Sequence, residues 1–152
     1  MKTAILAVAL AFQVAGAAKT VVPPMDVQET VKPILALCEE TKTTDLKRQT
    51  AAAWKIDGMT GDLFRVKTKS GDEALVVLMN FYLGESIDED LLHEITVRGK
   101  RMLPLLLEYR NARVAFSEKK YPSPLLVAPD VRKENFDEVI EAVRAGKVIG
   151  VD

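Results

Sequence analysis

The chain has 152 residues, with 21 Lys and Arg against 22 Asp and Glu, and a single cysteine. A net charge of −1 gives no bulk attraction to nucleic acid or to an anionic membrane, which argues against nucleic-acid binding as the function. One cysteine excludes an internal disulfide, so packing alone must hold the fold together.

The N-terminus has the pattern of a cleavable signal peptide. Lys2 supplies a positive start, and the run from Ala4 to Val14 is apolar except for Gln13. The segment Ala15-Gly16-Ala17 then offers small residues at the positions that a signal peptidase recognises. We therefore expect cleavage after Ala17.

Export follows from this interpretation, to a periplasm or out of the cell. The apolar run is too short to span a hydrocarbon core of about 30 Å. A buried N-terminal helix is the alternative, but such a helix would have a polar face and this stretch has none. Removing residues 1–17 leaves 135 residues, 18–152, which is the size of one domain and contains no apolar run long enough to cross a membrane.

The first element of the mature chain is predicted to be an amphipathic helix that ends near Thr41. Residues 19–25 precede it as an extended lead-in, and Asp26 with Glu29 has the spacing of a capping box. Pro33 either kinks this helix or begins it. Five apolar residues share one face of the helix: Val27, Val31, Ile34, Leu35 and Cys38.

A second helix is predicted to begin after Thr44 or Asp45 and to end at Gly58. Its shared face is formed by Leu46, Thr50, Ala53 and Trp54. We expect Trp54 to be a core or core-edge aromatic rather than the wall of a ligand cage, and the same expectation covers Phe81, Tyr82 and Tyr109.

Residues 63–81 fit two different structures. In the first, the alternation of apolar and basic residues over 64–68 predicts a strand, which a turn joins to a second strand over 74–81. That hairpin would make the fold α+β. In the second, Ser70 and Glu73 form a capping box at the start of a helix.

The helical alternative covers residues 71–83 and is closed by Gly84. Its length and its caps favour it over the hairpin, although the apolar run within it has no period. The predicted fold is therefore mainly α, a small compact domain of paired amphipathic helices, with the α+β hairpin near 63–81 as the alternative.

A long helix is predicted over residues 87–112, with acidic residues at its start and basic residues at its end, as the helix macrodipole favours. Gly99 and Pro104 should bend it or split it in two. After a proline-rich loop over residues 119–129, a final helix is predicted from Asn135 to Ala145.

The inward face of this final helix is predicted to be Phe136, Val139, Ile140 and Val143. Gly146 is expected to be its C-cap. Residues 147–150 would then be a short strand or a tail.

The fragments Gly71-Asp72-Glu73-Ala74-Leu75 and Met102-Leu103-Pro104-Leu105-Leu106 resemble the helix pairs of HEAT-like α-helical repeats. The resemblance covers residues 70–113, about a third of the chain, and no clean second copy accompanies it. Because such repeats usually present binding surfaces, the resemblance implies a partner-binding role. A small compact bundle is equally consistent with the length.

Metal chemistry has little support in the sequence. His93 is the only histidine and shares a helix face with Glu89, but neither an HExxH motif nor a Cys/His cluster accompanies it. The pattern over residues 86–90 begins like a calcium loop, yet Leu91 stands where a glycine is needed and Val97 where a glutamate is needed. We therefore predict no metal site.

Catalytic chemistry has no clear motif either. Cys38 lies on an apolar helix face, which favours a core thiol over a nucleophile and over an interchain disulfide. No GxSxG elbow or glycine-rich phosphate loop occurs, so neither catalytic nor cofactor-binding residues are predicted.

Residues 98–120 have the strongest charge bias, with two acidic residues, Glu108 and Glu118, against seven basic ones. The basic residues are Arg98, Lys100, Arg101, Arg110, Arg113, Lys119 and Lys120. They could face an anionic partner, but a solvated helix end is the favoured interpretation. Together these observations predict an exported, soluble binding module whose partner is another protein. Two alternatives stay open, a small secreted hydrolase with a cryptic site and a carrier of a small apolar ligand.

Overall fold

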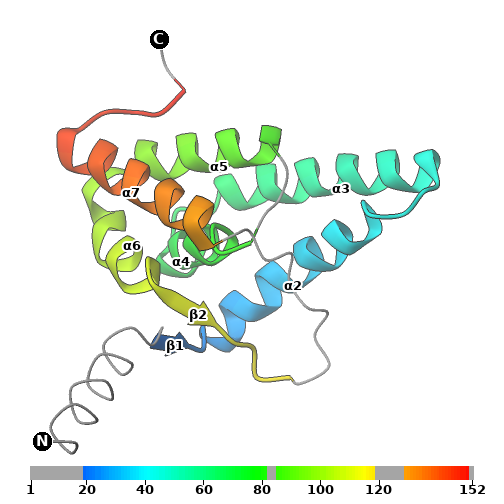
Figure 1. The fold of residues 1–152 in the computed structure, drawn as a ribbon, viewed down its shortest axis with the longest axis horizontal. Helices are drawn as coiled ribbons and strands as arrows, with labels where there is room; N and C mark the ends of the chain where they lie inside the picture. The colour runs from blue at the N-terminus through cyan, green and yellow to red at the C-terminus, as the bar shows by residue number, and fades with distance from the viewer. Residues whose placement is uncertain (1–18, 82–84, 119–128, 151–152) are drawn as a thin grey trace, which may run out of the picture.

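The computed structural model describes residues 19–81, 85–118 and 129–150, and it is mainly α-helical (Figure 1). The predicted signal peptide, Tyr82, Gly84 and the loop over 119–128 lie outside the described residues. The elements in chain order are β1 (Lys19–Val21), α2 (Met25–Glu40), α3 (Leu46–Phe64), α4 (Lys69–Leu78), α5 (Glu85–Arg98), the 3-10 turn η1 (Gly99–Met102), α6 (Leu103–Tyr109), β2 (Ala112–Val114) and α7 (Pro129–Ala145). The mainly α prediction is confirmed.

The hairpin alternative is wrong because α4 occupies its place at the centre of the molecule. Residues 74–78 of α4 are all fully buried, since α2, α5 and α6 pack around it. A helix buried on every side shows no amphipathic period, which is why this run was ambiguous in the sequence. The cap is Thr68, whose hydroxyl accepts a hydrogen bond from the Gly71 amide at 3.2 Å, and not the expected Ser70.

Helix α2 buries the five apolar residues predicted for its inner face. It begins at Met25, so Pro33 lies inside it and does not start it. The capping box at Asp26 is wrong, because Asp26 lies in the first helical turn and its carboxylate accepts a hydrogen bond from the Ser70 hydroxyl at the start of α4. The residue thus joins two helices.

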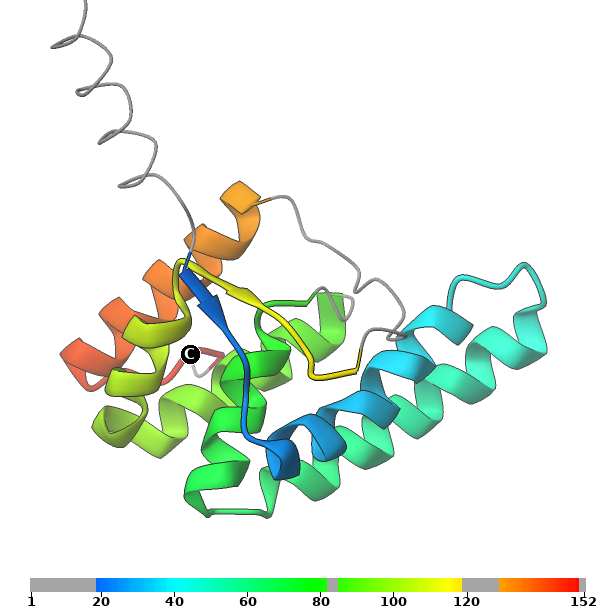
Figure 2. The ribbon, with the colours of Figure 1, turned by 90° about the horizontal axis from the view of Figure 1, so that it is seen from below.

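Helix α3 begins as predicted, with the Asp45 carboxylate accepting hydrogen bonds from the amides of Lys47 and Arg48. Its predicted end at Gly58 is wrong, since α3 continues to Phe64. A single glycine costs a helix only about 1 kcal/mol, which does not end a helix that packs against its neighbours. With α2, α3 forms a helical hairpin that projects from the rest of the molecule (Figure 2).

The long helix predicted over 87–112 is divided, as Gly99 and Pro104 indicated. Gly99 has a φ of +75°, the left-handed conformation that ends α5, and Pro104 lies in the first turn of α6. The final helix α7 buries all four residues predicted for its inner face. At its end Gly146 has a φ of +68°, and the Lys147 amide donates to the Ala142 carbonyl at 2.9 Å.

Two short strands were not predicted. β1 pairs in parallel with β2, with Lys19 beside Ala112 and Val21 beside Val114. Buried Gln28 supports the pair, since its side chain donates to the Pro23 carbonyl at 2.6 Å and accepts from the Ser117 amide at 3.1 Å. The N-terminal segment is thereby tied to residues 112–117.

None of the described helices has the length and hydrophobicity that crossing a membrane requires.

Candidate functional site

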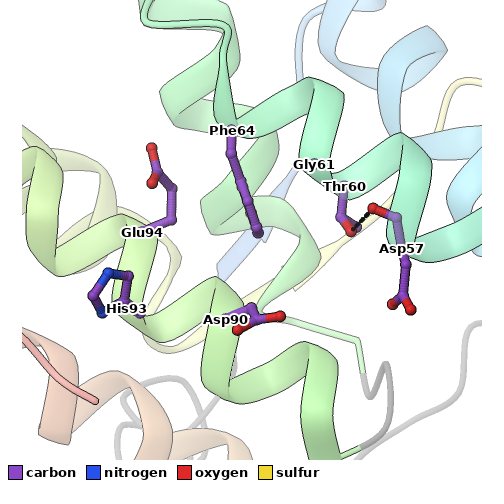
Figure 3. Close-up of a pocket in the computed structure, with 7 residues that line it drawn as sticks. All are labelled: Asp57, Thr60, Gly61, Phe64, Asp90, His93 and Glu94. Atoms are coloured by element: carbon purple, nitrogen blue, oxygen red, sulfur yellow. Dashed lines mark hydrogen bonds between the residues drawn. The ribbon is translucent and has the colours of Figure 1, made fainter. Parts of the chain in front are cut away.

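A groove of about 490 Å³ lies between α3 and α5 (Figure 3). Both helices run toward the same end of this groove, because Phe64 ends α3 and Arg98 ends α5. Phe64 and Glu94 therefore lie near the C-terminal ends of the two helices, whereas Asp57 and Asp90 lie nearer their N-terminal ends (Figure 3). The complete lining is Asp57, Thr60, Gly61, Phe64, Asp90, His93 and Glu94.

The C-terminal ends of α3 and α5 are joined by Arg98, whose side chain is only 1% exposed. Its guanidinium donates to Asp72 at 2.7 Å and to Glu94 at 3.0 Å. It also donates to the Phe64 carbonyl at 3.1 Å and to the Leu63 carbonyl at 3.3 Å, both in the last turn of α3, where carbonyls lack intrahelical partners. The Leu63 carbonyl accepts from the Val66 amide as well. A positive charge at these two helix C-termini also opposes their macrodipoles favourably.

The ion-pair network extends to the surface through two more basic residues. Arg101 donates to the same Asp72 oxygen at 2.8 Å, and Lys67 pairs with Glu94. The expectation that residues 98–120 form a solvated basic rim is therefore wrong for Arg98, which is buried. Arg110 also has an internal partner, since its guanidinium binds the Asp137 carboxylate of α7.

His93 has a structural role in the groove wall. Its Nδ1 lies 2.7 Å from the Ile149 carbonyl oxygen, and because a carbonyl can only accept, Nδ1 is the donor. The adjacent Ile149 amide donates to the Thr96 hydroxyl at 3.0 Å. These two contacts fasten residues 147–150 to α5 as a tail, and the alternative of a terminal strand is wrong.

The side chains of the groove do not form a recognisable reaction centre. Among the described residues, no three His, Cys, Asp or Glu side chains are grouped to hold a metal ion. Thr60 is the one hydroxyl in the lining, and it already donates to backbone carbonyls, Ile56 at 2.9 Å being the nearer. Asp57 and Asp90 turn toward one another from the two helices, both exposed to solvent.

Cys38 is buried among apolar side chains on α2, as its pattern predicted. Burial raises the pKa of its thiol to about 11, so the reactive thiolate is scarce at neutral pH. Tyr109 and Phe81 are buried, as predicted for core aromatics. Burial and the neighbouring Glu73 carboxylate, which accepts from the Tyr109 hydroxyl at 2.7 Å, raise the pKa of Tyr109.

The outer face of α3 is the second candidate, and sequence reasoning misplaced it. Trp54 is 72% exposed and Leu46 is 74% exposed, so the expectation of a core tryptophan is wrong. A shallow depression about the indole is lined by Leu46, Lys47, Thr50, Ala51 and Trp54. The buried face of α3 is instead formed by Ala52, Ile56, Thr60 and Leu63.

A helix-wheel reading that gave equal weight to these four residues would have found the true inner face. They recur at i, i+4, i+8 and i+11, as the apolar residues of α2 do, but Ala52 and Thr60 are small or polar. The prediction instead placed the large apolar side chains, Leu46 and Trp54, on the inner face. In the structure Leu46 and Trp54 lie on the exposed side of α3, opposite its buried face.

No protein-family model matches this chain, and neither does any curated protein or any solved structure.

Proposed function

We propose that this chain is a protein-interaction module and that its contact surface is the outer face of α3. The single observation that supports this most is the exposure of Trp54, at 72%, beside Leu46, at 74%. Tryptophan is enriched among the residues that contribute most to protein–protein binding. Trp54 lies on a projecting helix, so most of its apolar surface is available to a partner and is not used in packing the core.

The charges around this face define the partner. The side-chain ammonium groups of Lys47 and Lys55 have no hydrogen bond or ion pair to any described residue. They flank Trp54 at i−7 and i+1, which makes a basic rim around an apolar centre. The surface therefore suits a partner helix with an apolar centre that offers a carboxylate at its edge.

The two alternative functions have less support from the described side chains. A hydrolase needs a nucleophile beside a base, and the hydroxyl of Thr60 in the groove is bound to backbone carbonyls instead. A carrier of an apolar ligand needs an apolar cavity, whereas Asp57, Asp90 and Glu94 line the groove.

The sole tryptophan of the chain allows a direct test, because its fluorescence reports on this surface alone. Binding of a partner should shift the emission of Trp54 to shorter wavelength as the indole leaves water. Trp54→Ser should abolish the binding, while Leu107→Ser, on a half-exposed residue of α6, should leave it intact. A complex that forms without any change in Trp54 emission would contradict the proposed surface.

A further inference from the structure

We infer that the outer face of α3 binds a second copy of this chain, with the two α3 helices antiparallel across a two-fold axis. This inference rests on the proposed function, because it uses the same surface and names its partner.

The exposed stripe of α3 has the spacing of a helix–helix contact. Its residues recur at intervals of four, three, four and three: Lys47, Ala51, Trp54 and Gly58, which are exposed, and Gly61, which is half-buried and also lines the groove beside α5. This alternation keeps the stripe on one side of the helix, opposite the buried Ala52 and Ile56. At about 1.5 Å per residue the stripe is about 21 Å long, enough for three turns of a facing helix.

The sizes of these residues are complementary when the two helices are antiparallel. A two-fold axis between positions 54 and 55 brings the two indoles near one another at the centre and sets Ala51 of each copy opposite Gly58 of the other. A Cβ on Gly58 would meet no atom within 4 Å, so no contact inside the chain requires a glycine there. Glycine is a poor helix former, but it lets a second backbone approach closely.

The charges favour the same antiparallel register. It sets Lys47, near the start of α3, opposite Asp62, near its end, and symmetry repeats the pair. Lys47 has no side-chain partner among the described residues, and the only ion pair of Asp62 is a 3.8 Å contact with Arg65 in which both side chains are at least 80% exposed. A parallel pair would instead set Lys47 against its own copy. Antiparallel macrodipoles add to the preference.

The test measures association of the purified exported chain by sedimentation velocity, alongside Trp54 emission at the same concentrations. We expect a concentration-dependent dimer whose formation shifts the emission to shorter wavelength. Gly58→Gln should weaken the dimer by about tenfold or more, because its side chain fills the space opposite Ala51. The same variant should fold at least as well as the parent, since the added side chain points into open space.

A charge exchange tests the register. Lys47→Glu and Asp62→Lys should each weaken the dimer, and the double variant should recover it, because each copy then offers both partners in exchanged positions. A chain that stays monomeric at every accessible concentration would overturn the inference, as would a dimer that Trp54→Ser leaves unchanged. A monomer whose Trp54 emission still shifts when a different protein binds would overturn only the identity of the partner, and the proposed function would stand.

Discussion

Arg98 shows how much a single side chain can determine in a domain of this size. Its guanidinium is almost wholly buried and donates hydrogen bonds to two carboxylates and two carbonyl groups from three helices. Arg98→Met should lower the free energy of unfolding by about 3–5 kcal/mol, because Asp72 would be left buried with a weakened set of partners. Urea denaturation measures this loss. Arg65→Met, on an exposed side chain, is the control and should change stability by less than about 0.5 kcal/mol.

Two helical glycines should respond in opposite directions to the same substitution. A Cβ on Gly71 would lie 2.4 Å from the Val66 carbonyl oxygen, so Gly71→Ala forces the chain before α4 to move and should cost about 1–3 kcal/mol. A Cβ on Gly61 meets nothing within 4 Å, so Gly61→Ala should stabilise α3 by about 1 kcal/mol. Thermal unfolding of the two variants under identical dilute conditions compares them. Equal shifts in one direction would contradict this packing.

At the scale of elements, the pair Arg110–Asp137 joins α6 to α7 and should respond to acid. The hydrogen bond from Arg110 lowers the pKa of the Asp137 carboxyl below its usual value. A carboxylate with a lower pKa in the folded state stabilises the fold above its unfolded pKa, about 3.9. That contribution is lost as pH falls through the folded value.

Asp137→Asn should therefore flatten the pH dependence of the urea midpoint below about pH 4 and leave the helices formed. The effect is small, because the carboxylate faces solvent. Measuring the midpoint at several pH values for both proteins provides the check. Parallel curves would show that the pair does not contribute.

The elements themselves were predictable where one residue type decides the geometry. Gly99 and Gly146 marked helix ends because only glycine readily takes a positive φ, and Asp45 marked a start because its carboxylate reaches free amides. Trp54 was misplaced because hydrophobicity does not reveal which side of a helix is covered. The pairing of Arg98 with Glu94 follows from their i,i+4 spacing on α5, but its contacts with Asp72 and the end of α3 could not be predicted, since they form only after α3, α4 and α5 have packed.

At the scale of the whole molecule, the proposed export predicts where the mature chain begins. Cleavage after Ala17 would leave β1 intact, since that strand begins at Lys19. Intact-mass measurement of the exported chain should therefore match residues 18–152. A mass that retains Met1 would contradict export by this signal, and a start beyond Val21 would remove the strand that pairs with β2.

The pairing of β1 with β2 also constrains the order in which the chain can fold. The partner of Lys19 is Ala112, about 90 residues further along the chain, so the strand cannot find its place until most of the domain has been synthesised. Helices α2, α3 and α4 contact one another and are close in the sequence, so they can form while the chain is still being synthesised. Docking of β1, the segment that follows the proposed signal, is therefore a late step, so the N-terminal end of the chain is still unpaired when a translocation channel would first engage it.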